Sequence, residues 1–239
     1  MTGTARKNGG FVICTARLAW FFVYRMISVF DGQQGAPAPD EKNSASDTGF
    51  GAGADSGRAF VLGLSVLGCE PPVWRRVVVR EDMWLQQLHD AIQIAFDWFD
   101  YQTHAFIIGE SHYGNPVNNE AGLIEDDRDV TLEDIDLALH EKIFYRYNFD
   151  EGWTVEINVE KIIPVEKGAR YPSCVAGGRA GPPEDCGGVE AYHGMIASLK
   201  EPHSEMSEEW REWLGPEYDP ERCDLREINK ALAGIGADK

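Results

Sequence analysis

The segment KIFYRYNFDEGWTVEINVEKII, residues 142–163, decides the fold. Its apolar side chains alternate with mostly polar ones on both sides of the short interruption Asp150-Glu151-Gly152. Alternation with a period of two places one set of side chains on one face of a strand and the other set on the opposite face. The segment therefore predicts an antiparallel hairpin, with strands at 142–148 and 153–163, that buries one face and leaves the other in water.

The chain before this segment predicts another hairpin and then a helix. Apolar residues alternate over 59–67, and a β-branched run lies in a second strand over 73–79. Apolar residues at spacings of three and four predict a helix over 83–97, with Asp82 as its N-cap. A third strand is expected over 103–108.

The remaining segments predict loops and helices. Residues 109–129 and the Cys/Gly/Pro-rich stretch 171–188 have the composition of loops. A short helix is expected after the capping box formed by Thr131 and Asp134, and three more follow near the C-terminus. These helices span residues 132–139, 189–199, 204–214 and 225–233.

The order of these elements indicates an α+β domain over residues 58–239. Hairpin connections and terminal helices imply a mainly antiparallel sheet of about five strands, with helices on one face and a helical C-terminal part. No internal repeat divides this region, so a single domain is expected there.

Charge is unevenly distributed along the 239 residues. Residues 1–57 hold five basic and five acidic side chains, so the formal net charge of −18 lies on residues 58–239. This acidity disfavours nucleic acid and anionic membranes as partners, because binding to phosphates depends on Lys and Arg. The five cysteines are odd in number and lack the spacing of a disulfide scaffold, which is typical of a protein of the reducing cytoplasm.

Residues 1–57 are expected to form a poorly ordered N-terminal extension and linker. The apolar run 11–30 is interrupted by Arg17 and Arg25, whereas a spanning helix needs about 20 apolar residues in succession. Residues 31–57 are rich in Gly, Ala, Ser, Asp and Pro, a composition typical of a flexible linker. A membrane anchor is therefore not expected.

Several motifs together resemble the plasmid pRiA4b open-reading-frame-three-like family, also described as passenger proteins of insertion sequences. They are PPVWRR at 71–76, LHDAIQ at 88–93, Trp98 followed by HAF at 104–106, YNF at 147–149, VEKI at 159–162, PPEDCGG at 182–188 and DPE at 219–221. The resemblance covers nearly all of residues 58–239. It implies an uncharacterised domain associated with mobile elements and brings no settled activity with it.

The resemblance also raises the question of a metal. In the family, a histidine on a strand and cysteines in the loop could form a zinc-like site, because zinc takes imidazole and thiolate ligands in sets of four. Val155 and Gly181 stand here where the family has such a histidine and cysteine. Cys174 and Cys186 remain as candidates, but their spacing is not that of a zinc knuckle or ribbon. We interpret them as small buried residues, and no metal or other cofactor is expected.

The sequence contains no nucleophile elbow and no phosphate-binding glycine loop, so no catalytic residue is assigned. The candidates for a binding site are residues that could line a pocket or a recognition surface: Trp74, Arg76, His89, His104, Trp153, Glu184 and Asp185. Each has a structural alternative. Arg76 can pair with a carboxylate, a histidine can be satisfied at the edge of the core, and Glu184 with Asp185 can cap the helix that begins near residue 189.

These features favour a non-enzymatic domain that binds a protein partner, as an accessory protein encoded on mobile DNA. Two alternatives stay open. One is a metal-dependent or small-molecule enzyme that uses the Cys174/Cys186 loop with a nearby histidine. The other is a nucleic-acid binder that uses a local patch at Arg75 and Arg76.

Overall fold

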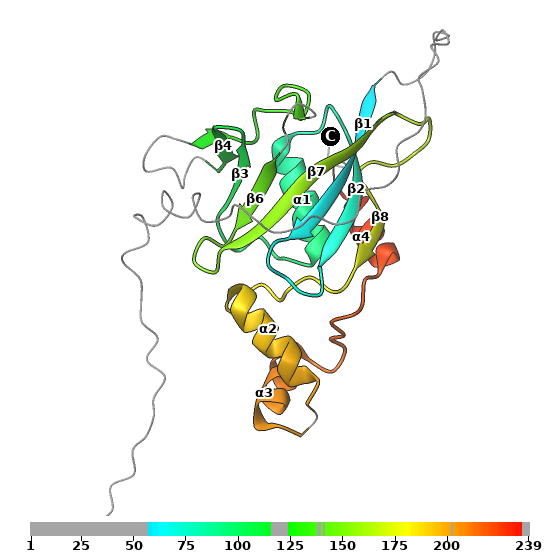
Figure 1. Cartoon of the computed structure of the whole chain (residues 1–239). Helices are drawn as coiled ribbons and strands as arrows, with labels where there is room; N and C mark the ends of the chain where they lie inside the picture. The colour runs from blue at the N-terminus through cyan, green and yellow to red at the C-terminus, as the bar shows by residue number, and fades with distance from the viewer. Residues whose placement is uncertain (1–56, 116–123, 138–139, 141, 202, 236–239) are drawn as a thin grey trace, which may run out of the picture. The chain divides into compact units, whose positions relative to one another are not determined.

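A single mixed sheet organises the part of the chain that the computed structural model describes, residues 57–115, 124–137, 140, 142–201 and 203–235. Its eight strands follow the order β5-β4-β3-β6-β7-β1-β2-β8 (Figure 1). The strands are β1 (Arg58–Val66), β2 (Trp74–Arg80), β3 (His104–Ile108), β4 (Ser111–Gly114), β5 (Ile124–Asp126), β6 (Ile143–Tyr147), β7 (Trp153–Pro164) and β8 (Ser173–Gly178). The helices are α1 (Leu85–Phe96), α2 (Gly188–Leu199), α3 (Glu205–Leu214) and α4 (Leu225–Leu232).

The hairpin predicted from the alternating segment is β6 and β7. They pair antiparallel, with Tyr147 opposite Trp153 and Tyr145 opposite Val155. These four side chains are fully buried. β7 continues the sheet by pairing with β1, and β1 pairs with β2, so both predicted hairpins are confirmed. The inward faces of these strands form the centre of the core.

The sheet is larger than the expected five strands, because three strands lie in segments predicted to be loops. β4 and β5 are only four and three residues long, which is too short to show an alternating pattern in the sequence. They pair parallel with each other. β8 pairs antiparallel with β2 although it ends in Gly177 and Gly178. A Cβ at Gly178 would lie 2.6 Å from the indole nitrogen of Trp74. Glycine at that position therefore reflects close packing inside a strand rather than a turn.

β8 lies at an edge of the described sheet, and α4 covers part of that edge. The side-chain amide of Asn229 donates to the carbonyl of Cys174 (2.7 Å), and its oxygen accepts from the Cys174 backbone N–H (2.8 Å). One amide side chain thus satisfies both backbone groups of Cys174 that a further strand would otherwise pair.

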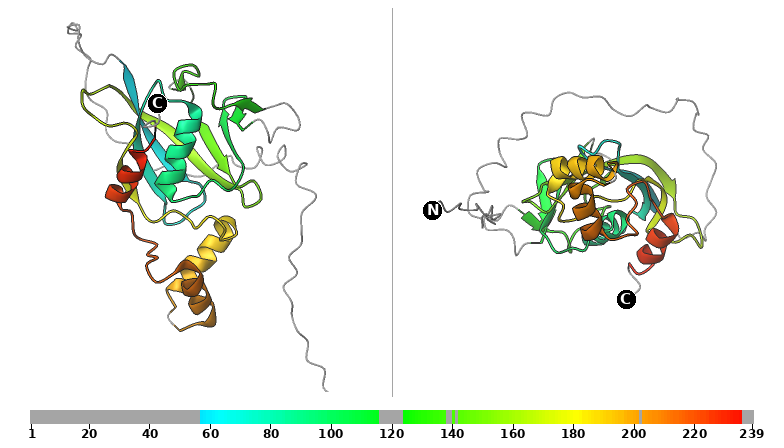
Figure 2. Two further views of the ribbon diagram at one scale, coloured as in Figure 1. Left: turned by 180° about the vertical axis from the view of Figure 1, so that it is seen from behind. Right: turned by 90° about the horizontal axis from the view of Figure 1, so that it is seen from below.

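α1 lies across one face of the sheet (Figure 2). Its apolar stripe, with Leu85, Leu88 and Ile92 fully buried, packs on the core as expected. The predicted N-cap Asp82 is wrong: the helix is capped at Trp84, whose backbone N–H donates to Gln87 (3.1 Å), while Asp82 pairs with Arg80. Asp82 lies too early in the chain to reach the first free amides of this helix.

The expected helix over 132–139 is a series of turns in its described residues. The capping box is present, because the Thr131 and Asp134 side chains each accept a backbone N–H from the other residue. At α4, the carboxylate of the N-cap Asp224 accepts from the backbone N–H groups of Arg226 and Glu227. A capping box alone therefore opens a turn, which propagates into a helix only where packing supports it.

α2 and α3 pack against each other, whereas α4 contacts β8 and α1 (Figures 1 and 2). The expectation that the helices lie on one face of the sheet stays a prediction for α2 and α3. The opposite face of the sheet carries a small apolar cluster of Ala59, Val61, Val78 and Val165. In the described residues, no helix has the length and apolar character needed to cross a bilayer.

Candidate functional site

Two predicted site residues, His89 and His104, meet between α1 and β3. Their rings stack with centroids 3.7 Å apart and planes inclined by 16°. Asp100 approaches from the segment after α1, with its Oδ1 3.0 Å from Nε2 of His89. One potential metal-ligating atom from each of these three residues lies within 4.8 Å of the others. We call His89, Asp100 and His104 the histidine–aspartate cluster.

A chain of hydrogen bonds determines which nitrogen of His89 carries its proton. The backbone N–H of Asp100 donates to Oε1 of Gln93 (3.0 Å), so the amide nitrogen of Gln93 must be the atom that faces Tyr145. That nitrogen donates to the phenolic oxygen of Tyr145 (2.8 Å). The phenol in turn donates its own proton to Nδ1 of His89 (2.7 Å). His89 is therefore the tautomer with hydrogen on Nε2.

His89 is neutral in the folded protein. Burial, assisted by the neighbouring His104, lowers the pKa of His89 to about 3. Its Nε2 is buried and makes no hydrogen bond, although Oδ1 of Asp100 lies 3.0 Å away. An unpaired buried polar atom is rare in folded proteins and calls for an explanation.

A buried carboxylate orients His104. Nε2 of His104 lies 2.7 Å from Oδ2 of Asp127, which is 2% exposed and directly follows β5. The ring of His104 also stacks near that of Tyr145, with centroids 5.9 Å apart. The Asp127 pair holds the ring by its Nε2, so Nδ1 is the nitrogen that remains for another partner.

Glu184 and Trp153, two further predicted residues, lie in a layer next to this cluster. The phenol of Tyr147 donates to Oε1 of Glu184, and Oε2 accepts the backbone N–H of Phe99 (2.8 Å). The indole of Trp153 donates to the backbone carbonyl of Glu184 (3.3 Å). The indole of Trp98 donates to Pro182 (2.9 Å). These bonds fasten the segment 98–100, which carries Asp100, to the loop before α2.

The expected capping of α2 by Glu184 and Asp185 is wrong. Glu184 is turned inward and 6% exposed, whereas Asp185 is exposed. The N-cap of α2 is Gly187, and the first helical N–H, that of Gly188, donates to Oε2 of Glu151 (3.1 Å). The cap therefore comes from the β6–β7 turn, because the Tyr147 and Phe99 bonds already occupy both oxygens of Glu184.

A shallow surface groove of about 630 Å³ opens beside the cluster. Among the described residues, its lining contains two carboxylates and no cation: Gln87, Asp90, Gln93, Ile94, Trp98, Phe99, Asp100, Ala231, Gly234 and Ile235. Burial raises the pKa of Asp90 and of Asp100. Phe99 and Tyr101 stack on each other with centroids 5.7 Å apart, yet they remain 62% and 76% exposed. We call this surface the α1–α4 groove.

Trp74 and Arg76 lie on β2, outside both the groove lining and the cluster. The guanidinium of Arg76 stands 5.7 Å from the centre of the Trp74 ring and pairs with Glu160 (Nη2 to Oε1, 2.9 Å). Arg75 points to the opposite face, is 2% exposed and donates to the carbonyl of Ala95 (2.7 Å). Stacking and ion pairing, the structural alternatives for these residues, are therefore both present.

Cys174 and Cys186 are free, buried thiols. Burial raises the pKa of both, that of Cys186 to about 12, so each is protonated at neutral pH. Among the described residues, neither belongs to a group of three or more potential metal ligands.

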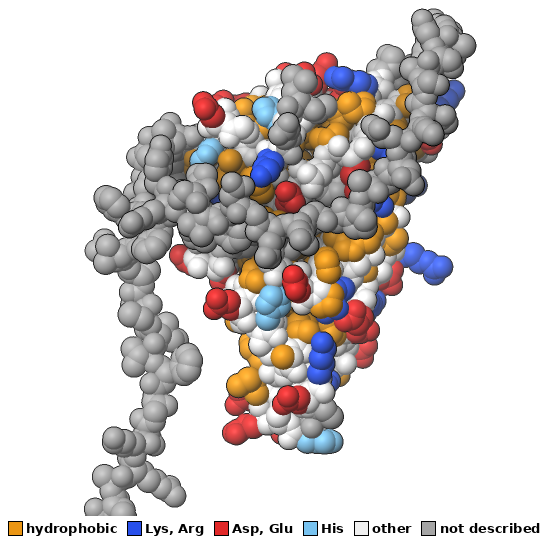
Figure 3. All heavy atoms as spheres, in the orientation of Figure 1, with side chains coloured by type: hydrophobic (Ala, Val, Ile, Leu, Met, Phe, Trp, Pro, Cys, Tyr) orange, Lys and Arg blue, Asp and Glu red, His pale blue; other side chains and the backbone are white. Residues whose placement is uncertain are grey.

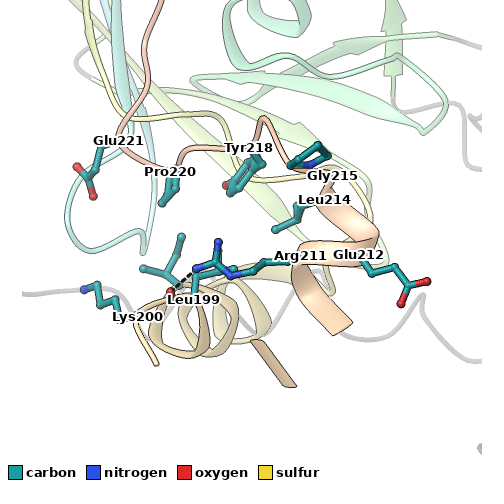
Figure 4. Close-up of a pocket in the computed structure, with 11 residues that line it drawn as sticks. Leu199, Lys200, Arg211, Glu212, Leu214, Gly215, Tyr218, Pro220 and Glu221 are labelled. Atoms are coloured by element: carbon teal, nitrogen blue, oxygen red, sulfur yellow. Dashed lines mark hydrogen bonds between the residues drawn. The ribbon is translucent and has the colours of Figure 1, made fainter. Parts of the chain in front are cut away.

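A second hollow, about 550 Å³ in volume, lies between α2, α3 and residues 214–221 (Figure 4). Arg211 spans it by donating to the carbonyl of Leu199 (2.9 Å), and no predicted site residue lines it.

Sequence reasoning missed Asp100, Asp127, Tyr145 and Gln93. A usable signal existed for Tyr145, because it occupies an inward position of an alternating strand and a buried phenol needs a hydrogen-bond partner. Asp100 and Asp127 had no such signal. Both lie in loops, and their approach to the histidines depends on contacts that only the folded chain provides.

Comparison with known proteins identifies relatives of the whole domain. The family model described as plasmid pRiA4b ORF-3-like protein matches residues 58–227. An uncharacterized protein of Sinorhizobium fredii, y4hQ, is 31% identical over 170 residues, which cover 70% of this chain and 87% of that protein. The crystal structure of MM3350 from Methanosarcina mazei, a protein of unknown function, superposes with a TM-score of 0.67 at 34% identity, covering 72% of this chain and 98% of that one. The chain therefore belongs to the plasmid pRiA4b ORF-3-like family.

Proposed function

We propose that this domain is a non-enzymatic protein-binding module that takes a cationic, partly apolar segment of its partner into the α1–α4 groove. The observation that carries the proposal is that exposed Phe99, stacked on Tyr101, lies beside two carboxylates in a lining whose described residues include no cation. Aromatic anchors surrounded by polar groups are typical of the residues that dominate protein interfaces.

The aromatic pair is held by its backbone. The N–H of Phe99 is bonded to Glu184 and the N–H of Asp100 to Gln93, so the segment is fixed although its side chains are exposed. A partner that binds Phe99 and Tyr101 therefore does not have to order this segment. Preorganisation of this kind improves affinity by lowering the entropic cost of binding.

Electrostatics supports a basic partner. Burial disfavours the negative charge of Asp90 and of Asp100, and repulsion from nearby carboxylates raises the pKa of both further. A lysine or arginine side chain placed between them would stabilise both carboxylates. The formal net charge of −18 would also steer a basic protein towards this surface and repel an acidic one. In Figure 3 acidic side chains are scattered over the visible face among apolar ones.

The biological setting belongs to the same proposal. We place the protein in the cytoplasm because its four described cysteines are free thiols. We assign it an accessory role on mobile DNA because the family takes its name from a plasmid. Nucleic acid is a weaker alternative, since the Arg75 side chain of the proposed basic patch is buried and Arg76 is paired with Glu160.

A designed peptide tests the proposal. The probe is a labelled peptide that alternates lysine with leucine and tryptophan, and its control replaces every lysine by glutamate. Fluorescence anisotropy should detect binding of the basic peptide alone, and this binding should weaken as salt is added. Replacing both Phe99 and Tyr101 by alanine should lower the affinity about tenfold or more.

The matched control is Trp213→Ala, which removes a 52% exposed aromatic side chain from α3. It should leave the affinity unchanged. Equal loss in the control variant, or equal binding of the glutamate peptide, would show that the α1–α4 groove does not recognise a basic segment.

A further inference from the structure

We propose that the histidine–aspartate cluster, His89, Asp100 and His104, binds a divalent transition metal ion of the zinc type. The inference goes beyond partner binding in the α1–α4 groove and does not depend on it. Two observations carry it: the ligand atoms of the three side chains lie within 4.8 Å of one another, and Nε2 of His89 is buried without a hydrogen-bond partner.

The set of donors decides the class of ion. Two imidazoles and one carboxylate are the ligands of zinc, and of cobalt, iron or manganese in related sites. Calcium and magnesium require mostly oxygen donors, which this cluster does not offer. Three protein ligands also leave one coordination position of a tetrahedral ion for water or a bound group.

The surroundings of the two histidines are those of metal ligands. His104 is bonded through Nε2 to the buried carboxylate of Asp127, at 2.7 Å, and His89 through Nδ1 to the phenol of Tyr145, at 2.7 Å. A hydrogen bond from the second ring nitrogen to a carboxylate or another polar group typically orients a metal-binding imidazole. These bonds leave Nδ1 of His104 for the ion, and Nε2 of His89 becomes available once its proton has moved.

Two local changes accompany binding. The proton on Nε2 of His89 must move to Nδ1, where it is donated to the oxygen of Tyr145, and the phenol O–H, which then no longer donates to Nδ1, must turn to another acceptor. The stacked rings must also tilt apart, because parallel rings 3.7 Å apart direct their lone pairs along separate planes. Asp100 completes the set from the surface side, since its side chain is 56% exposed whereas that of His89 is 2% exposed. The ion would thus lie at the floor of the α1–α4 groove, which Asp100 also lines.

The experiment is a titration of the chelator-stripped, full-length chain with Co²⁺ and then Zn²⁺, followed by optical spectroscopy and calorimetry. We expect one ion per chain and visible absorption bands of four-coordinate cobalt. Imidazole and carboxylate ligands should produce no intense near-ultraviolet band of the thiolate-to-cobalt type. Such a band would instead place the ion on a cysteine and overturn the proposal, as would the absence of saturable binding by the wild-type chain.

Variants assign the ligands. Asp100→Asn changes an exposed side chain, so the protein should fold, and it should weaken Co²⁺ binding by about tenfold or more. Asp150→Asn is the control, because Asp150 is an exposed carboxylate that lies outside the cluster and outside the groove lining. It should leave the metal affinity unchanged, and equal weakening by both variants would contradict the assignment. His104→Gln should lose the metal and keep the basic peptide, which separates this site from the proposed protein-binding function.

Discussion

Removing the hydroxyl of Tyr145 tests the hydrogen-bond chain on which the histidine–aspartate cluster depends. In Tyr145→Phe the amide of Gln93 loses its acceptor and Nδ1 of His89 loses its donor, and both groups are buried. Each buried polar group left unpaired costs about 1–3 kcal/mol. Two such groups together cost about 2–6 kcal/mol. The variant should lose slightly less than this, about 2–5 kcal/mol of unfolding free energy, because the phenol no longer has to be desolvated.

The assay is urea unfolding followed by tryptophan fluorescence. Tyr101→Phe makes the same chemical change at a 76% exposed position and should alter stability by less than about 0.5 kcal/mol. A triple variant, His89→Leu, Gln93→Leu and Tyr145→Phe, removes the partners together. Its loss should be smaller than the sum of the single losses by about 1 kcal/mol or more. A Tyr145→Phe variant as stable as the wild type, or additive losses, would refute the reasoning.

Three further predictions address the stability and the reactivity of the domain. Burial lowers the pKa of His89 to about 3, whereas a histidine in an unfolded chain titrates near 6.5. Above about pH 6.5 His89 is neutral in both states, and its titration does not lower the free energy of unfolding. Stability should be lost as the pH falls from about 6.5 towards 3, by about 4–5 kcal/mol in the limit, and His89→Leu should flatten this part of the curve measured by urea unfolding. Gly181→Ala should fail to fold or lose several kcal/mol in a thermal melt, because a Cβ there would lie 1.8 Å from the backbone oxygen of Phe96. A thiol reagent applied to a Cys14→Ser variant at pH 8 should modify Cys223 first, since burial raises the pKa of Cys69 and Cys186 to about 12; rapid modification of Cys186 in the folded protein would contradict this.

The parts of the fold that could be predicted from the sequence are those where one residue pattern repeats. β6 and β7 alternate over most of their length, and α1 has a clear apolar stripe, so all three elements lie close to their predicted bounds. β4, β5 and β8 could not be found in this way. The first two are too short to show a period, and glycine in β8 is required by contact with Trp74 and Cys223 rather than by a turn.

The candidate site was predictable to the same extent. His89 stacks on His104, and the indole of Trp153 donates to the backbone carbonyl of Glu184, so the predicted residues are in contact as two pairs. Asp100 was out of reach, because its place depends on two left-handed residues, Asp97 and Asp100 itself, that turn the chain back after α1. Local sequence does not specify that turn without the bonds from Gln93 and Glu184.

The Asn229 amide has a consequence for how this protein behaves at high concentration. By occupying both backbone groups of Cys174, it denies an incoming β-strand from another molecule a place to begin pairing along β8. Val175, the neighbouring residue, is 51% exposed and would otherwise offer an apolar contact to such a strand. A single side chain on α4 thus blocks strand pairing at Cys174, and Asn229→Leu should increase the formation of β-rich assemblies, as measured by light scattering and thioflavin fluorescence.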